Sequence, residues 1–292
     1  MPLVLTLIAA PDFADFPGFV TAFQQRLAIT QQPLWLHPGH AADLVLAPAD
    51  REPAERLLQG QFIDYGFQLQ ENRRRKLLIA DMDSTMIGQE CIDELAAEVG
   101  LKEKVAAITA SAMRGEIEFE PALRERVALL KGLPESVVDE VIRNRITLTP
   151  GGTTLVATMK QHGAYTALVS GGFTAFTGRI ARRIGFDENR ANILNAENGR
   201  LTGTVREPIL GRQAKIEALQ QISVRLGISP AQAMAVGDGA NDLGMIRLAG
   251  LGVAIHAKPA VAAEADIRIE HNDLTALLYL QGYAKADWTA PG

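Results

Sequence analysis

The sequence contains one cysteine and no long apolar run, and both absences limit what the chain can be. Cys91 has no partner within the chain, which excludes an intrachain disulfide and fits a reducing compartment. No segment approaches the roughly 18 apolar residues that cross a bilayer. The first residues also lack the positively charged start of a signal peptide. We therefore expect a cytoplasmic protein without a membrane partner.

Basic residues are fewer than acidic ones. Lysine and arginine total 29 against 34 aspartates and glutamates, so the formal charge is −5, which argues against a nucleic-acid partner. The hydrophobic content of 47% and the charged content of 22% are typical of globular proteins. A chain of 292 residues is long enough for one large domain with smaller attachments.

Residues 77–85 carry the first chemical signal. Leu77–Ala80 is a short apolar run that predicts a buried strand, and Asp81 and Asp83 follow it directly. In open parallel sheets, ligands bind beyond the carboxyl ends of the strands. Two carboxylates at such an end can supply a nucleophile and a proton donor, and they attract a divalent cation. A turn followed by a helix cap fits this stretch equally well on its own.

Residues 1–72 are predicted to form a small N-terminal unit with the β-α-β-β-α-β order of ferredoxin-like folds. The expected strands are 3–9, 33–37, 43–46 and 62–69, and the expected helices are 16–27 and 52–58. We interpret His37, His40 and Asp43 as loop polar groups rather than a metal site. The basic run at residues 71–76 is interpreted as a solvated hinge.

Residues 89–147 are predicted to form four short amphipathic helices. Gly100, Gly115 and Gly132 end the first three, and Pro134 opens the fourth. Brief connections between such helices favour a small bundle. The bundle interrupts the chain just after the Asp81 strand, where a lid over a site would be inserted.

Residues 73–88 and 148–292 are predicted to form the core, an α/β fold with a doubly wound parallel sheet. The later strands are expected at 165–169, 233–236, 252–255 and 267–269, and the helices at 153–162, 173–184, 212–226 and 273–280. Asn198-Gly199 between two alternating segments predicts a hairpin at the sheet edge.

Three predicted strands end in polar or glycine-rich stretches, at residues 81–85, 170–172 and 237–242. In a parallel sheet these ends share one edge, so the stretches should converge. Residues 170–172 are expected to form a tight turn whose Ser170 hydroxyl and glycine amides face a phosphate. Asp238 and Asp242 add carboxylates suited to Mg²⁺, and Lys215 supplies a cation.

In this order the motifs resemble those of the haloacid dehalogenase superfamily of phosphohydrolases. The resemblance rests on Asp81-x-Asp83-x-Thr85, Ser170, Lys215 and Gly237-Asp238-Gly239-x-Asn241-Asp242. The fuller wording is similar to superfamily members that hydrolyse phosphoserine, and it is carried by Glu90, Met113, Phe119, Arg126 and Val169-Ser170-Gly171-Gly172-Phe173. The predicted bundle resembles the superfamily's small helical cap. The N-terminal unit resembles, more weakly, amino-acid-binding (ACT-like) regulatory domains.

The resemblance implies a role for each acidic residue. Asp81 would attack phosphorus and form an aspartyl-phosphate, while Asp83 would protonate the leaving hydroxyl and then activate water. Mg²⁺ would be held by Asp81, by the backbone carbonyl of Asp83 and by Asp238, with Asp242 in support.

The resemblance also implies how the substrate is held. Ser170 and Lys215 would bind phosphoryl oxygens, with Gly171, Gly172 and Asn241 as further substrate-binding residues. A serine head group is a zwitterion and needs one fixed cation and one fixed anion, which Arg126 and Glu90 would supply. Phe119 and Met113 would wall the pocket. The role of Arg124 stays open.

The expected function is therefore Mg²⁺-dependent hydrolysis of O-phospho-L-serine, the last step of serine biosynthesis. One alternative is a capped phosphatase for another small phosphate ester. Another is a catalytically silent amino-acid sensor. The ACT-like resemblance implies an amino-acid ligand for the N-terminal unit, and a homodimer is left open.

Overall fold

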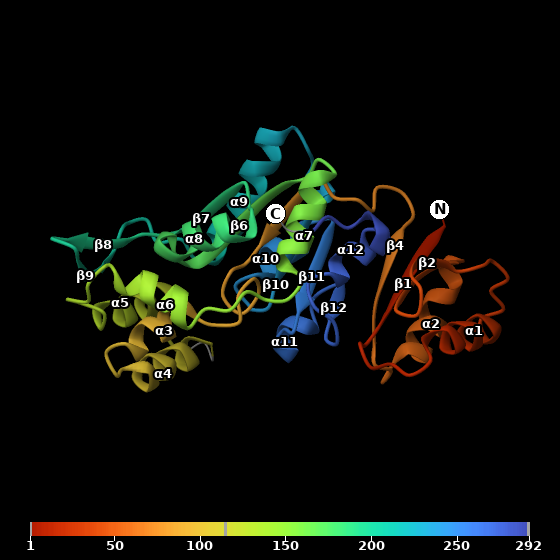
Figure 1. Ribbon diagram of the computed structural model, residues 1–292, viewed down its shortest axis with the longest axis horizontal. Helices are drawn as coiled ribbons and strands as arrows, with labels where there is room; N and C mark the ends of the chain where they lie inside the picture. Colours follow the sequence, from red (N-terminus) through yellow and green to blue (C-terminus); the bar gives the residue numbers. More distant parts are fainter. Residues whose placement is uncertain (1, 114–115, 291–292) are drawn as a thin grey trace.

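The computed structural model describes residues 2–113 and 116–290. Three parts follow one another along its longest axis (Figure 1). An N-terminal unit lies at one end, the core lies in the middle, and a helical cap with a protruding hairpin lies at the other end. Within residues 2–113 and 116–290, no helix is long and apolar enough to span a membrane.

A parallel sheet forms the centre of the core. Its strands are β5 (Leu77–Ala80), β6 (Tyr165–Phe173), β7 (Glu188–Asn192), β10 (Ala233–Gly237), β11 (Leu251–Ile255) and β12 (Ile267–Ile269), in the spatial order β12-β11-β10-β5-β6-β7. Ala80 at the end of β5 lies opposite Leu168 of β6 and Val236 of β10. This register brings the carboxyl ends of the three strands together.

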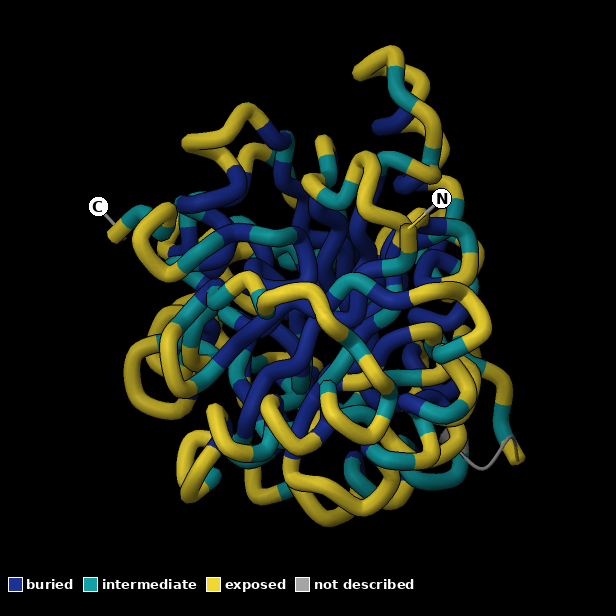
Figure 2. The backbone as a smooth tube through the Cα atoms, turned by 90° about the vertical axis from the view of Figure 1, so that its right-hand side faces the viewer, coloured by how far each residue is buried: buried dark blue, intermediate teal, exposed yellow. Residues whose placement is uncertain are grey.

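Helices cover both faces of this sheet. One face packs against α7 (Gly152–Gln161), α8 (Thr174–Ile184) and α12 (Ala276–Leu280), and the other against α9 (Arg212–Leu226) and α10 (Leu243–Leu248). A short helix, α11 (Pro259–Ala262), precedes β12. Strand residues alternate accordingly, because Leu78 packs with the first group of helices and Ile79 with the second. Figure 2 shows the buried strands enclosed by more exposed segments.

The N-terminal unit has the expected ferredoxin-like order. Its elements are β1 (Leu3–Ala9), α1 (Phe16–Arg26), β2 (Leu34–His37), β3 (Ala41–Leu46), α2 (Arg51–Leu58) and β4 (Ile63–Leu69), with strands ordered β2-β3-β1-β4. β4 pairs antiparallel with β12 of the core, with Tyr65 opposite Arg268. The two parts therefore share one continuous ten-stranded sheet.

The interpretation of residues 71–76 as a solvated hinge is wrong for Arg73. Its guanidinium donates to Asp43 at 2.6 Å, to the Thr6 hydroxyl at 2.8 Å and to the carbonyl oxygen of Leu280 at 3.2 Å. The side chain is only 10% exposed. Buried charge needs partners, and Arg73 finds them in both the N-terminal unit and the core. The basic segment is thus partly a clamp between the two parts.

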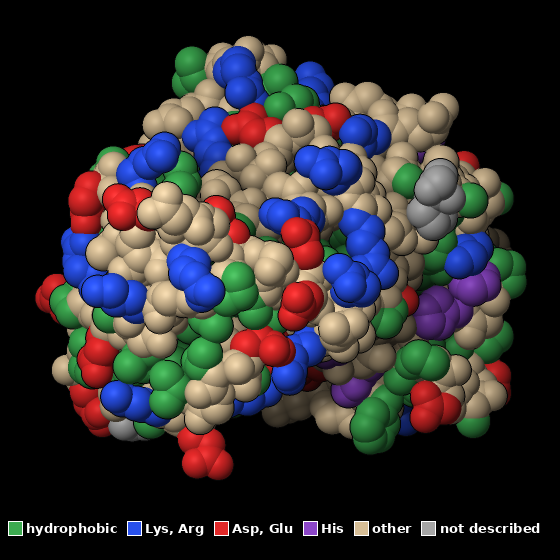
Figure 3. Space-filling model, turned by 60° about the vertical axis from the view of Figure 1, so that its left-hand side comes forward, with side chains coloured by type: hydrophobic (Ala, Val, Ile, Leu, Met, Phe, Trp, Pro, Cys, Tyr) green, Lys and Arg blue, Asp and Glu red, His purple; other side chains and the backbone are tan. Residues whose placement is uncertain are grey.

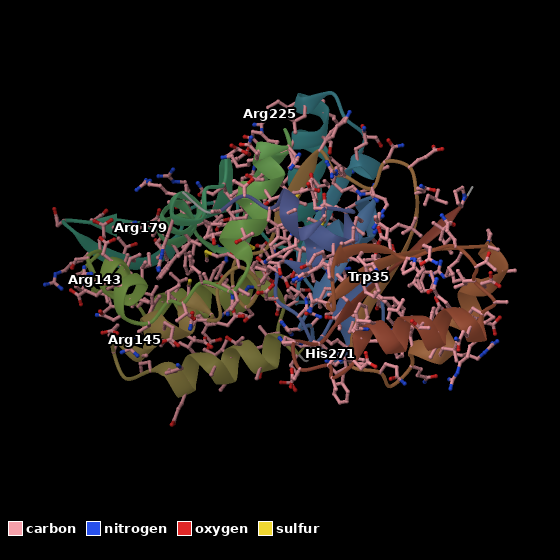
Figure 4. The ribbon with its side chains drawn as sticks, turned by 45° about the vertical axis from the view of Figure 1, so that its right-hand side comes forward. Trp35, Arg143, Arg145, Arg179, Arg225 and His271 are labelled. Carbon is pink, nitrogen blue, oxygen red and sulfur yellow. The ribbon has the colours of Figure 1, made fainter. Side chains whose placement is uncertain are left out.

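The cap comprises α3 (Cys91–Ala97), α4 (Lys102–Met113), α5 (Phe119–Ala128) and α6 (Val137–Asn144). Beside it lies the hairpin of β8 (Leu194–Glu197) and β9 (Arg200–Val205) (Figure 1). The amide of Gly132 donates to the carbonyl of Leu201, and the amide of Leu201 donates to the carbonyl of Leu133, both at 2.8 Å. Arg179 of α8 also forms an ion pair with Asp139 of α6, so the cap contacts the core at this point. Figure 4 labels Arg179 at the end of the molecule that carries the cap.

Three sequence-based expectations differ from the structure. Residues 170–172 continue strand β6 to Phe173, and no tight turn separates them from α8. The fourth cap helix begins at Val137, because Pro134 forms a bridge with Arg200 of the hairpin instead. The last helix spans only Ala276–Leu280. Gly115, expected to end the second cap helix, lies outside the described residues.

Candidate active site

The ends of β5, β6 and β10 supply the polar groups of the site. Asp81 follows β5 and its amide donates to the carbonyl of Val236 at 3.0 Å, so its backbone extends the sheet by one residue. Ser170 lies near the end of β6, and Asp238 directly follows β10. The predicted convergence of the three strand ends is therefore present in the structure.

Three buried carboxylates gather at this edge of the sheet. On the face of the molecule drawn in Figure 3, basic and acidic side chains are interspersed. Oxygens of Asp81, Asp238 and Asp242 lie within 4.8 Å of one another, and no other group of three potential metal-binding residues occurs in residues 2–113 and 116–290. Thr85 donates its hydroxyl to Asp238 at 2.9 Å, and the amide of Gly239 donates to Asp242 at 3.1 Å. These bonds fix the orientation of two of the acids.

Lys215 enters this acidic group from α9. Its Nζ lies 2.6 Å from Oδ1 of Asp81 and 2.6 Å from Oδ1 of Asp242, and the side chain is 2% exposed. Burial alone would lower the pKa of Lys215, but Asp242 and Asp81 reverse that effect and raise it. Lys215 is therefore a fixed cation at neutral pH.

The acids themselves are easier to protonate than free carboxyls. Burial, followed by the charge of Asp242, raises the pKa of Asp81 well above its usual range. Burial and the neighbouring Glu90 raise the pKa of Asp83 to about 7, and burial and Asp242 raise that of Asp238 to about 6. One ammonium thus shares a buried space with an excess of negative charge.

A divalent cation fits this group on the chemistry of its donors. Asp81, Asp238 and Asp242 present hard carboxylate oxygens, which suit ions such as Mg²⁺. Lys215 balances only one of three negative charges, and each raised pKa above reflects repulsion or desolvation that a bound cation would relieve.

Asp83 is not a member of this group of three acids. Its Oδ1 accepts from the amide of Cys91 at the start of α3 (2.9 Å), and its Oδ2 accepts from the hydroxyl of Ser170 at 3.3 Å. Ser84, the residue after Asp83, has a backbone φ of 55°, which is uncommon in residues other than glycine. Its hydroxyl donates to Glu90 at 2.8 Å, which links the acidic loop to the residue that precedes helix α3 of the cap.

Arg126 is the buried cation of the cap. It is 8% exposed, and it donates to the carbonyl of Ala122 and to the hydroxyl of Thr109, both at 3.1 Å. Burial lowers its pKa, while the charges of Asp93, Glu90 and Asp83 oppose that shift. The charges of Asp93, Glu90 and Asp83 therefore lie close enough to Arg126 to act on its pKa.

The remaining predicted residues divide into three groups. Gly171 and Gly172 lie beside Phe119 and Asp83 respectively, whereas Asn241 folds over Gly239. Arg124 is an exposed residue that forms ion pairs with Glu120 and Glu207. The side chain of Met113 lies outside the described residues.

Asn192 is a residue at this edge that sequence reasoning missed. It ends β7, is 2% exposed, and forms three hydrogen bonds to the backbone of Gly171 and Leu210. The signal was available, since Asn192 is a polar residue at the carboxyl end of another parallel strand. It was overlooked because Glu188–Asn192 is too polar to predict a strand.

Comparisons with known proteins agree with this geometry. The family model of haloacid dehalogenase-like hydrolases matches residues 78–247. A phosphoserine phosphatase of Albidiferax ferrireducens is 50% identical over 210 residues, which cover 70% of this chain and 89% of the relative.

Two solved structures extend the likeness to the fold. A hydrolase of the same family from Salmonella enterica serovar Typhi has a TM-score of 0.85 and 31% identity, covering 96% of this chain and 98% of its own. A phospho-aspartyl intermediate analogue of phosphoserine phosphatase has a TM-score of 0.66 and 43% identity, covering 70% of this chain and 98% of its own. The first likeness includes the N-terminal unit, and the second corresponds to about the length of core and cap.

Proposed function

This chain belongs to the haloacid dehalogenase-like hydrolases and, among them, to the phosphoserine phosphatases, and on that premise we propose how its residues hydrolyse O-phospho-L-serine. The observation that carries the proposal is the contact of Lys215 with both Asp81 and Asp242 at 2.6 Å. The fold does not need a buried lysine between two acids for its stability. The reaction does benefit from it, because a carboxylate nucleophile that approaches an anionic phosphate needs a cation beside it.

Asp81 is the nucleophile of the proposed reaction. One of its oxygens bonds to phosphorus as the bond from phosphorus to the serine oxygen breaks, which gives an aspartyl-phosphate. The amide of Met82 (2.8 Å) and Lys215 both hold Oδ1, so the carboxylate is oriented before the substrate binds. Mg²⁺ held by Asp81, Asp238, Asp242 and the Asp83 carbonyl would neutralise phosphate charge.

Asp83 is the proton carrier. With its pKa raised to about 7 it holds a proton near neutral pH, and it gives this proton to the leaving serine oxygen. The resulting carboxylate then takes a proton from the water that attacks the aspartyl-phosphate, releasing inorganic phosphate and free Asp81. Its hydrogen bonds from Cys91 and Ser170 hold it beside the phosphoryl position.

The cap recognises the serine head group. Arg126 binds the substrate carboxylate, and Glu90 accepts from the ammonium, so the zwitterion receives one partner of each charge. Glu90 is oriented by the Ser84 hydroxyl, which couples the ammonium site to the loop that carries Asp83. The amino-acid ligand expected for the N-terminal unit and the homodimer stay predictions.

Phosphate release from L-phosphoserine, phosphothreonine, phosphoethanolamine and p-nitrophenyl phosphate tests the proposed function. We expect a strong preference for L-phosphoserine, and we expect loss of activity in EDTA with recovery in Mg²⁺. Arg126→Ala should lower kcat/KM for phosphoserine by about 100-fold, because a buried charge-assisted pair contributes about 2–3 kcal/mol. It should change phosphoethanolamine hydrolysis little, since that ester has no carboxylate.

Equal activity on all four esters would retain a phosphatase and refute the assigned substrate. Equal losses on phosphoserine and phosphoethanolamine in Arg126→Ala would refute carboxylate recognition by this residue. Lys131→Ala, at an exposed cap lysine, is the matched control for removal of a cation from the cap.

The raised carboxyl pKa values predict how Mg²⁺ affects stability. The folded metal-free chain keeps protons on Asp83 up to about pH 7 and on Asp238 up to about pH 6, whereas unfolded aspartates lose theirs near pH ~3.9. The unfolded state then binds fewer protons, so these groups lower the free energy of unfolding as pH rises through that interval. At Asp238 a proton competes with the cation for the same carboxylate oxygens, so Mg²⁺ binding strengthens as pH rises through about 6.

We therefore expect the gain in Tm on replacing EDTA by Mg²⁺ to be larger at pH 8 than at pH 5. At a hundredfold excess over Kd, Mg²⁺ should add about 2.7 kcal/mol, or about 5–10 °C. Calorimetry measures Tm at each pH in Mg²⁺ and in EDTA. The difference between the two Tm values removes the effect of all groups that titrate equally in both conditions. Asp238→Asn should lose most of this gain, and a gain independent of pH would contradict the protonation of these acids.

A further inference from the structure

The ring of Phe119, at the first position of cap helix α5, lies between two glycines of the core. A Cβ added to Gly171 would lie 3.3 Å from Cζ of the ring, and a Cβ added to Gly211 would lie 3.2 Å from Cδ1. Both values are tighter than ordinary van der Waals contact. The two glycines thus form the walls of a narrow seat for the aromatic ring.

Asn192 holds the two walls together. Its Nδ2 donates to the carbonyl of Gly171 at 2.9 Å and to the carbonyl of Leu210 at 3.0 Å, and its Oδ1 accepts from the amide of Leu210 at 2.7 Å. Both donors and the acceptor of this buried amide are used, which is costly to disturb. Gly171 in β6 and Gly211 before α9 are therefore kept at a fixed separation.

The seat determines where the rest of α5 lies. Arg124, five residues after Phe119, forms an ion pair with Glu207 in the loop that leads to Gly211. Arg126 lies two residues further along the same helix. A helix anchored by its first residue and by this ion pair has little freedom to slide, so the position of Arg126 follows from the position of Phe119.

We propose that Gly211 and Asn192 are positioning residues for substrate recognition: Asn192 sets the spacing of the seat, and Gly211 leaves the space that the Phe119 ring enters. The inference rests on the proposed function, because the residue positioned is Arg126, the assigned partner of the substrate carboxylate. Neither residue is one of the reacting groups assigned above. Their effect passes through the docking of the cap.

Gly211→Ala tests the seat with a single added methyl group. The backbone φ of Gly211 is −104°, which alanine adopts without strain, so the expected defect comes from contact with the ring. We expect KM for L-phosphoserine to rise about 10- to 100-fold, because displacement of a positioning group by about 1 Å can cost 100-fold. Hydrolysis of phosphoethanolamine should change less than about threefold, since it does not use Arg126.

Gly178→Ala is the matched control, because a Cβ there meets open space in helix α8. Phe119→Leu introduced into Gly211→Ala should recover part of the lost kcat/KM for phosphoserine, since the smaller side chain makes room for the methyl group. Asn192→Asp, which replaces both donors with an oxygen facing two carbonyls, should show the same split between the two esters.

Three outcomes would overturn the inference: Gly211→Ala equal to Gly178→Ala, equal losses on both esters, or additive effects of Phe119→Leu and Gly211→Ala. Asn192→Asp that fails to fold would leave the glycine variants to decide. Absence of phosphoserine preference in the unmodified chain refutes the proposed function instead, so the two failures are distinguishable.

Discussion

Asp81→Asn is expected to abolish turnover of L-phosphoserine while the chain stays folded. An amide oxygen does not form the aspartyl-phosphate, and loss of a covalent nucleophile costs about 10⁴- to 10⁶-fold in kcat. Folding should persist because Lys215 retains Asp242 as a partner at 2.6 Å. The substitution also removes a carboxyl whose charge burial disfavours, so we expect Tm in EDTA at pH 8 to be unchanged or higher.

The measurement is single-turnover phosphate release together with mass spectrometry of the acid-quenched enzyme. The unmodified chain should show an added phosphoryl group on the peptide containing Asp81, and the variant should show none. Asp12→Asn, at an exposed position, controls for the same chemical change elsewhere. If Asp81→Asn turns over L-phosphoserine within tenfold of the unmodified chain, Asp81 is not the nucleophile.

Lys215→Met is expected to damage both catalysis and stability. The variant leaves Asp81 and Asp242 as buried carboxylates without their shared cation, and breaking a buried pair costs about 3–5 kcal/mol. Loss of a preorganised charge at the phosphoryl group should lower kcat by about 10³-fold or more. Urea denaturation in EDTA and steady-state kinetics in Mg²⁺ measure the two effects separately.

A second substitution separates the two roles of Lys215. Lys215→Met with Asp242→Asn removes one charge of each sign, so it should recover much of the lost stability. Activity should stay low, because no lysine remains beside Asp81 to hold a phosphoryl oxygen. Recovery of activity along with stability would mean that Lys215 acts only as a structural partner of Asp242.

The convergence of Asp81, Ser170 and Asp238 was predictable because parallel strands place their carboxyl ends along one edge. Strands β5 and β10 are short apolar runs, and a run of this kind followed by acids is typical of a ligand-binding strand end in an α/β chain. The hairpin at Asn198-Gly199 was equally predictable, since both residues adopt positive φ as such turns require. Local sequence patterns, together with the common edge of a parallel sheet, are enough to predict these features.

Features that depend on tertiary partners were not predictable. Arg73 belongs to a basic run that is typical of solvated segments, yet Asp43 and Thr6 of the N-terminal unit bury it. Strand β7 is polar, and it is a strand because β6 pairs with it. Asn192 is assigned a role only by its contacts with Gly171 and Leu210, which lie 21 and 18 residues away in the chain. Sequence periodicity contains no information about such partners.

The pairing of β4 with β12 also protects the core from other chains. An edge strand presents unpaired amides and carbonyls, which serve as a template for aggregation. In this chain β4 pairs with β12, and β2, a strand of four residues, is the free edge strand of the N-terminal unit. Asp64 reinforces the cover by accepting from the amides of Glu270, His271 and Asn272 just beyond β12. The N-terminal unit therefore covers one edge of the core sheet, and a core without it would leave the backbone groups of β12 unpaired on that side.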